Sequence, residues 1–438
     1  MSFLFIFPLL IYASAGVSGL TSIVGIFFIK DFLNLSAAFI ASIGFWAGIP
    51  WALKMPIGFL IDRYWYLKQY FVYLGAFLVS ISLLIMYGIL AHKNIMLNYL
   101  EIKIWFILST ILTPVGYVLQ DVVADAMTVE AVEPNFKNKS EKINKKDNKK
   151  EHTLVQLYGR FAIIFGALLV GLINIFIFKD VDQNYPNINL LYGKIYLFAL
   201  IIPAISVSGI LLFNYLNTND KKSIKFETTK LDYQIFLGSC TFVVFTVFLG
   251  SFNMVLSREI ILFSSLLLVA ILMRLLIKDL KKEDQYTIVG TAIIIFVFRA
   301  MPSPGAGLNW FEIDILGFDQ SFFSVLSVTS ASITLIGMFI LRKVMMRASL
   351  ANLFVILSIF SAFLYTPSLF MYYELHNYTS ILTNGIIDAR FIAILNTAVE
   401  SPLAQVAMIP MLAWIARNAP SKYKATFFAV FASFTNIA

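Results

Sequence analysis

Residues 70–91, YFVYLGAFLVSISLLIMYGILA, form a run without a charged side chain, and a helix of about 20 such residues crosses the hydrocarbon layer of a bilayer. Similar runs recur along the chain of 438 residues, which is 59% hydrophobic and 13% charged and has a mean hydropathy of +0.82. A soluble protein of this length carries more charge and shorter apolar runs. Because the runs are continuous rather than alternating, they predict an all-α polytopic membrane protein and not a β-barrel.

The predicted spans fall into two groups, separated by a polar stretch at 217–232. Before it they are 5–29, 37–61, 70–91, 104–127, 154–178 and 191–216, and after it 233–255, 260–277, 286–301, 321–341, 349–371 and 391–415. A last apolar run begins near Ala425 and is cut off at Ala438, which predicts an incomplete final helix. We therefore expect an N-terminal half of six helices at 1–216 with a cytoplasmic loop at 130–153, a linker at 217–232, an additional helix pair at 233–285, and an incomplete C-terminal half at 286–438.

Lysine and arginine are distributed unequally between the two ends of these spans. With the N-terminus placed in the cytoplasm, about 22 basic residues lie in or beside the inner loops and about seven on the opposite side. The net charge of +8 is therefore a signal of topology and does not predict a nucleic-acid partner. The lysine- and asparagine-rich stretch 135–150 lacks apolar periodicity and is predicted to be a mobile cytoplasmic loop.

Few side chains that bind metals or attack substrates are present. Cys240 is the single cysteine, which excludes an internal disulfide and a thiolate metal cage. The histidines are His92, His152 and His376, all near the ends of predicted spans. We therefore expect no metal, no cofactor and no enzymatic activity.

Several ionisable residues interrupt the apolar runs, where a charge is expensive and marks a functional site by default. The candidates for a substrate and proton pathway are Lys54, Asp121, Asp125, Arg160, Arg299 and Glu400. Such residues can also pair across helices and only hold the bundle together. For Lys54, Asp121 and Asp125 we favour the functional interpretation, because Asp121 and Asp125 lie four apart on one helix face and a carboxyl group there can load and release a proton. Arg160 and Arg299 stay charged and suit a substrate that bears a carboxylate or phosphate.

A weak internal repeat links the two groups of spans. Residues 58–63 read GFLIDR and residues 337–342 read GMFILR, so each places a glycine one turn before a helix end and an arginine five residues later. Two related halves are what a transporter needs to rock around a central site. For Gly58, Asp62 and Arg63 we favour a structural or gating role.

Residues 58–63 resemble the loop motif of the major facilitator superfamily, and four wider landmarks resemble the folate–biopterin transporter family within it. The landmarks are Pro50-Trp51 with Lys54, Gly58 and Asp62; the run 120–130, QDVVADAMTVE; Pro302-Ser303 with Leu316-Gly317-Phe318 and Phe323; and Pro420, the run 425–429, Ser433 and Asn436. The resemblance implies the facilitator fold, with two six-helix halves, and uptake of folates or pterins coupled to protons. It also makes Lys54, Asp121, Asp125 and Arg160 the first site candidates.

Two departures from the family pattern bear on substrate and coupling. Met55 follows Lys54 where the family has proline, and Lys424 occupies a position where the family has an acid. The expected partners are a small-molecule substrate, a proton and the lipid bilayer, and the protein is expected to be a monomer.

Three alternatives remain open at this stage. They are a facilitator for another small solute, a membrane-embedded transferase, and a sensor that does not transport. The membrane is expected to be a bacterial inner membrane, with an organelle membrane or a parasite plasma membrane as alternatives.

Overall fold

The computed structural model describes residues 6–32, 43–44, 46–48, 50–51, 54–130, 132, 145–179, 181, 187–217, 237–238, 240–241, 244–245, 248, 256–278, 281–300, 306–419 and 424–437. All regular structure in these ranges is helical. Nine segments within them are long and apolar enough to cross a membrane. The predicted all-α polytopic class is therefore confirmed.

The N-terminal half is built from long helices interrupted by short ones. Its elements are α1 (Ile6–Val17), η2 (Ser18–Thr21), α2 (Ser22–Phe27), η3 (Phe28–Phe32), α4 (Lys54–Arg63), η4 (Trp65–Leu67), α5 (Lys68–Ala91), α6 (Lys93–Leu97), α7 (Ile102–Glu130), α8 (Lys145–Phe178), α9 (Ile188–Phe198) and α10 (Ile201–Asn217). The predicted span 5–29 is thus a chain of short helices, and α7 continues through its internal Pro114.

The helix α8 begins earlier than expected. Its first residue is Lys145, within the predicted loop 130–153, whereas the apolar run begins at Leu154. Lysine and glutamate are good helix formers, and a helix that is already nucleated extends at little cost. The loop is therefore shorter than predicted, and residues 133–144 of it lie outside the described part of the chain.

After the predicted linker, α12 (Ser257–Ile277) falls in the stretch predicted to be an additional helix pair. The elements that follow are α13 (Lys282–Arg299), α14 (Ala306–Asp314), α15 (Gln320–Ile340), α16 (Arg342–Arg347), α17 (Leu350–Leu364), α18 (Thr366–Tyr372), α19 (Leu375–Leu382), α20 (Ala389–Asn418) and α21 (Lys424–Ile437). Side-chain caps fix three helix starts, because Asp319, Ser349 and Asp388 accept hydrogen bonds from backbone N–H groups three residues later. The predicted span 233–255 lies mostly outside the described residues.

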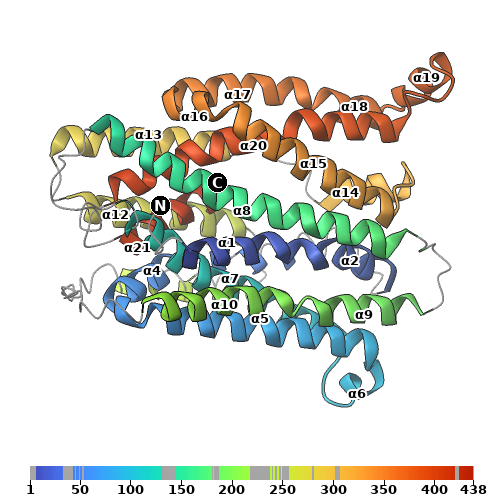
Figure 1. Ribbon diagram of the computed structural model, residues 1–438, viewed down its shortest axis with the longest axis horizontal. Coiled ribbons are helices and arrows are strands. Elements are labelled where there is room, and N and C mark those ends of the chain that lie inside the picture. Colours follow the sequence, from blue (N-terminus) through green and yellow to red (C-terminus); the bar gives the residue numbers. More distant parts are fainter. Residues whose placement is uncertain are drawn as a thin grey trace.

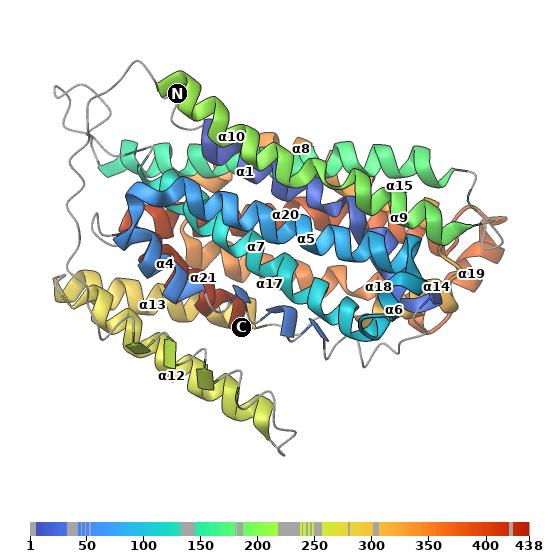
Figure 2. The same ribbon diagram turned by 90° about the horizontal axis from the view of Figure 1, so that it is seen from below.

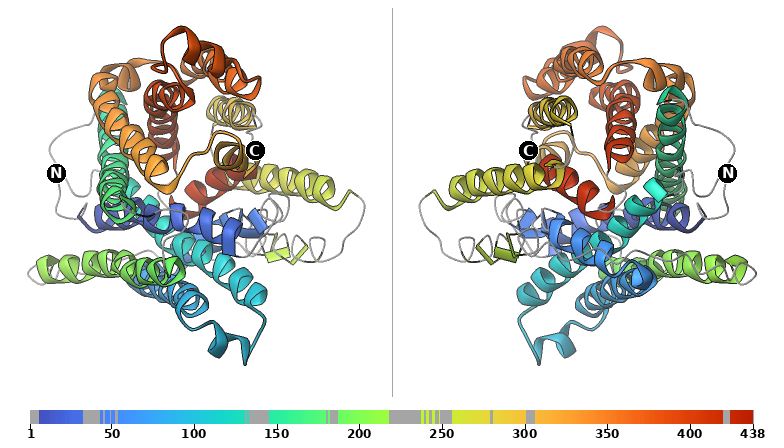
Figure 3. Two further views of the ribbon diagram at one scale, coloured as in Figure 1. Left: turned by 90° about the vertical axis from the view of Figure 1, so that its right-hand side faces the viewer. Right: turned by 90° about the vertical axis from the view of Figure 1, so that its left-hand side faces the viewer.

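The long helices run in roughly one direction and form a bundle (Figure 1). Helix α12 lies at the edge of the bundle and diverges from it (Figure 2). Seen along the long axis, the N-terminal half (blue to green) and the C-terminal half (yellow to red) lie against each other (Figure 3). The most extensive contacts between the halves are those of α4 with α21 and of α8 with α15 and α20.

The two ends of the bundle differ in the elements that they carry. Helices α4 and α16, which hold Arg63 and Arg342, lie at one end, which we name the basic end. Helices α6, α14 and α19 lie at the other, which we name the opposite end (Figure 1). A buried hydrophobic cluster that includes Met55, Phe59 and Phe427 joins α4 to helices of the C-terminal half.

Candidate transport site

Lys54 is the centre of a buried ion-pair group between α4 and α7. Its ammonium forms an ion pair with Asp121 Oδ2, and Asp125 Oδ2 lies 3.7 Å away. The Lys54 side chain is 5% exposed, that of Asp125 10% and that of Asp121 27%, so solvent reaches mainly Asp121. The i, i+4 spacing predicted that both carboxylates share a face of α7, and the structure turns that face toward α4.

Tyr12 of α1 belongs to the same group, although no sequence pattern singles it out. Its hydroxyl donates a buried hydrogen bond of 2.8 Å to Asp125 Oδ1. A tyrosine in an apolar run has the same pattern as a packed aromatic, so hydropathy and spacing leave this role invisible. The hydrogen bond orients Asp125 from the side away from Lys54.

Arg160 and Trp51 complete this part of the site. Arg160 lies on α8, is half-buried, and interacts electrostatically with Tyr12, Lys54 and Asp125. Within the described residues no carboxylate lies within ion-pair distance of Arg160. The Lys54 ammonium lies 5.1 Å from the centre of the Trp51 ring, within cation–π range.

Arg299 and Glu400 lie together in a separate cavity of the C-terminal half. This cavity of about 230 Å³ lies between α13, α17 and α20, and Gln405 also lines it. Glu400 accepts a long hydrogen bond of 3.4 Å from Asn396, and the buried Oε1 of Gln405 has no hydrogen-bond partner among the residues that the structure describes. The six predicted pathway residues therefore form two groups, one in each half.

Asp62 connects the two halves at the basic end. Its carboxylate accepts hydrogen bonds from the backbone N–H groups of Ala425 (3.0 Å) and Thr426 (2.7 Å) and from the Thr426 hydroxyl (2.6 Å). These donors form the first turn of α21, where a negative charge is favoured. Burial raises the pKa of Asp62 to about 6, while these hydrogen bonds and the charge of Lys424 act in the opposite direction.

Lys424 therefore lies where it stabilises an ionised Asp62 across the interface between the halves. Gly58 lets α4 approach α21, since a Cβ atom at that position would lie 2.7 Å from Ala429 Cβ and 2.8 Å from the Ala425 carbonyl oxygen. Of the three residues predicted to gate, Gly58 and Asp62 thus lie at a contact between the halves, and Arg63 ends α4 beside them.

Contacts between the halves are also present toward the opposite end. Lys30 of η3 forms an ion pair with Asp314 of α14. The rings of Phe27 and Phe323 meet edge to face with centres 6.1 Å apart. Gly171 brings α8 close to α15, because a Cβ atom there would lie 2.8 Å from Val328 Cγ2.

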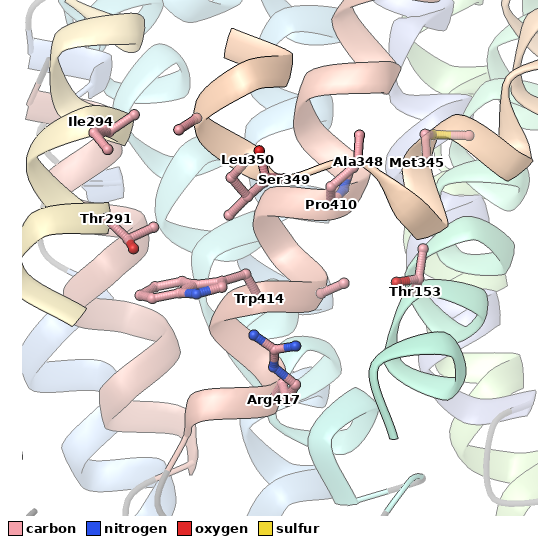
Figure 4. A pocket seen from close by; sticks show the side chains of 12 residues that line it. Thr153, Thr291, Ile294, Met345, Ala348, Ser349, Leu350, Pro410, Trp414 and Arg417 are labelled. Atoms are coloured by element: carbon pink, nitrogen blue, oxygen red, sulfur yellow. The ribbon is translucent and has the colours of Figure 1, made fainter. Parts of the chain in front are cut away.

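A further pocket of about 290 Å³ opens near the basic end. Trp414 and Arg417 reach it from α20, with Thr291 and Thr153 on either side (Figure 4). Sequence reasoning did not single out this pocket, because its residues come from five helices and one loop.

Of the family landmarks, Pro302, Ser303 and Pro420 lie outside the described residues, while Gly317 has φ of +66°, a conformation that favours glycine.

Comparison with known proteins connects this geometry to a family. The family model described as BT1 family matches residues 15–143 and 260–438. Folate transporter 1 of Plasmodium falciparum (isolate 3D7) is 29% identical over 104 residues, which are 23% of this chain and 20% of that protein. The aligned part thus spans a fifth of the length of that relative.

Solved structures share the fold at low sequence identity. A POT family transporter in complex with 5-aminolevulinic acid has a TM-score of 0.62 at 14% identity, with 99% of this chain and 88% of that chain covered. The xylose transporter XylE from E. coli, in a partially occluded inward open conformation, has a TM-score of 0.53 at 15% identity, with 99% and 92% covered. These similarities concern the fold alone.

Proposed function

Because the chain belongs to the BT1 family, the folate–biopterin transporters of the major facilitator superfamily, we propose that it carries a folate- or pterin-like anionic heterocycle across a membrane together with protons. The fold and the family make the chain a multi-pass membrane transporter and not an enzyme. The substrate and the coupling of its transport to protons are what we propose.

The observation that carries the proposal is the charge balance of the ion-pair group. Two carboxylates face one lysine, and the close ion pair of Lys54 with Asp121 leaves Asp125 as the second carboxylate. A buried charge without full compensation is costly, so binding a proton at Asp125 stabilises the group. Asp125 is therefore our candidate for the proton carrier.

Arg160 supports coupling between the proton and an anionic substrate. It contributes positive charge to the surroundings of Asp125 and has no carboxylate partner among the described residues. A substrate carboxylate that binds Arg160 neutralises this positive charge. The ionised form of Asp125 is then less stable, so Asp125 binds a proton more strongly. Because such coupling is reciprocal, the proton also strengthens binding of the anion.

The substrate class is supported by the side chains beside the charges. Trp51 offers a flat aromatic surface next to Lys54, and aromatic side chains stack on flat rings. Arginine binds carboxylates with paired donors. A ring that carries a carboxylate, as folates do, suits this combination better than an uncharged sugar does.

Uptake measurements test the proposal directly. In cells that neither make nor import folate, we expect saturable uptake of labelled folate and biopterin driven by a proton gradient and abolished by a protonophore. Asp125→Asn should remove the pH dependence of uptake without changing the amount of folded protein in the membrane. Asp284→Asn, at an exposed carboxylate in the first turn of α13, is the matched control and should behave as the unaltered chain does.

Two results would contradict different parts of the proposal. Unchanged pH dependence in Asp125→Asn would exclude Asp125 as the proton carrier. If the folded chain takes up neither compound, the substrate class is wrong. Competition with nucleosides, amino-acid derivatives and organic anions would then identify the class that the transporter carries.

A further inference from the structure

We propose that Tyr12 is a positioning residue that directs the transported proton to one oxygen of Asp125, the Oδ2 atom that faces Lys54. This inference rests on the proposed role of Asp125 as proton carrier. It assigns a function to the neutral member of the group around Lys54.

The two oxygens of Asp125 have different surroundings. Oδ1 accepts the Tyr12 hydroxyl hydrogen bond at 2.8 Å, and Oδ2 lies 3.7 Å from the Lys54 ammonium. Tyr12 and Asp125 are both buried, so water does not replace this donor. Because Oδ1 already accepts the hydrogen bond from the Tyr12 hydroxyl, Oδ2 is the oxygen left to bind the transported proton.

Close packing of α1 against α8 holds the Tyr12 ring in place. A Cβ atom on Gly159 of α8 would lie 2.9 Å from two ring carbons of Tyr12. One turn further along α1, a Cβ atom on Gly16 would lie 2.1 Å from the Ile163 carbonyl oxygen. A methyl group at Gly159 would displace the Tyr12 ring, and one at Gly16 would force α1 and α8 apart, so this close packing fixes where the Tyr12 hydroxyl points.

The hydrogen bond also sets how readily Asp125 gives up its proton. The charged and titratable groups that act on Asp125 are Asp121 of its own helix, Lys54 of α4, Tyr12 of α1 and Arg160 of α8. Of these, only Tyr12 donates a hydrogen bond to Asp125 among the interactions described. A donor to the ionised carboxylate stabilises that form and so favours release of the proton.

Water supplies the proton on one side of the membrane and accepts it on the other. A proton from water on one side binds Asp125 Oδ2 and gives a neutral carboxyl, while Oδ1 keeps the hydrogen bond from Tyr12. The same proton then leaves Oδ2 for water on the other side. Tyr12 keeps its own proton throughout, so it positions the carrier and does not relay the proton.

The pH profile of uptake tests this role with Tyr12→Phe, which keeps the ring packed on Gly159 and removes only the hydroxyl. Without the donor the ionised carboxylate is less stable, so half-maximal uptake should move toward alkaline pH by about one unit. Tyr196→Phe is the matched control, because Tyr196 is a buried tyrosine of α9 in a different core cluster. It should leave the profile unchanged.

Further variants separate this inference from the proposed function. If the unaltered chain shows proton-dependent uptake and Tyr12→Phe has the same profile, the inference is wrong and the proposed function stands. In an Asp125→Asn background, Tyr12→Phe should cause no additional change, and an additional shift would also overturn the inference. If Tyr12→Phe does not fold, Gly159→Ala displaces the ring with the hydroxyl intact and should shift the profile in the same direction; an unshifted profile would count against the inference.

Discussion

At the scale of single residues, two opposing effects set the pKa of Asp62. Burial raises the pKa of its carboxyl group from 3.8 to about 6, although the hydrogen bonds from Thr426 and Ala425 and the charge of Lys424 favour the ionised form. A group whose pKa is raised in a contact favours that contact in its protonated form. The contact between Asp62 and α21 is therefore most stable below pH 3.8, the ordinary pKa of the carboxyl group. It weakens as the pH rises through about 6, the pKa of Asp62 in the contact.

We predict that Asp62→Asn makes opening of the basic end independent of pH. The amide keeps an oxygen that accepts from α21 but does not ionise. The measurement is the labelling rate of Ala429→Cys, a buried position facing Gly58, in a chain where Cys240 is replaced by serine. The labelling rate is divided by that of the unfolded chain at the same pH, which corrects for the thiolate fraction. This ratio should rise through pH 6 with Asp62 present and stay flat with Asn. A ratio that still rises in the Asn variant would mean that another group titrates.

How far the site could be predicted from the sequence also depends on residue type. Lys54, Asp121 and Asp125 stand out because a charge in an apolar run needs a partner, and the i, i+4 spacing places the two carboxylates on one face. Tyr12 and Thr426 do not stand out, because neutral residues in such runs are common and their partners lie more than a hundred positions away. Only the packing of α1 and α21 reveals them.

At the scale of helices, hydropathy located the nine spans found in the described part of the chain but missed breaks within them. The predicted span 191–216 is divided into α9 and α10, and 349–371 into α17 and α18. Pro367 at the start of α18 explains the second break, since proline fits the first turn of a helix but not its interior. Apolar averages do not detect such breaks, because both sides of each break are equally apolar.

The close contact of α4 with α21 yields a prediction at the same scale. Gly58→Leu should separate the two helices, because even a Cβ atom at this position would lie 2.7 Å from Ala429 Cβ. We expect faster labelling of Ala429→Cys from the basic end and uptake reduced at least about tenfold, an effect of about 1.4 kcal/mol on the transport cycle.

Gly290→Leu on α13 is the control for this prediction, because a Cβ atom there meets no atom within 4 Å. It adds the same side chain to a helix that has room for it. Equal effects of the two substitutions would show that the loss comes from leucine in a helix and not from the contact between the halves.

At the scale of the whole molecule, contacts join the halves both near the basic end and toward the opposite end. Asp62 and Gly58 link α4 to α21, while Lys30 with Asp314 and Gly171 with Val328 link the halves toward the other end. A rocking transporter must break these two sets of contacts in turn, because substrate enters through one and leaves through the other.

This requirement predicts that locking either contact stops transport. The first pair is Gly58→Cys with Ala429→Cys, and the second is Gly171→Cys with Val328→Cys, each with Cys240 replaced by serine. A Cβ atom at Gly58 would lie 2.7 Å from Ala429 Cβ, and one at Gly171 would lie 2.8 Å from Val328 Cγ2. Since the Cβ atoms of a disulfide lie about 3.8 Å apart, joining the first pair requires a small separation of α4 from α21. Because a Cβ atom at Gly58 or Gly171 crowds the facing helix, we expect the reduced pairs to retain less uptake than the unaltered chain. Oxidation of either pair should abolish the uptake that remains and reduction should restore it to that level, while each single cysteine is unaffected by oxidant. If uptake continues with one pair fully cross-linked, that contact does not open during the cycle, and the halves move in a different way from the one that the two glycine contacts indicate.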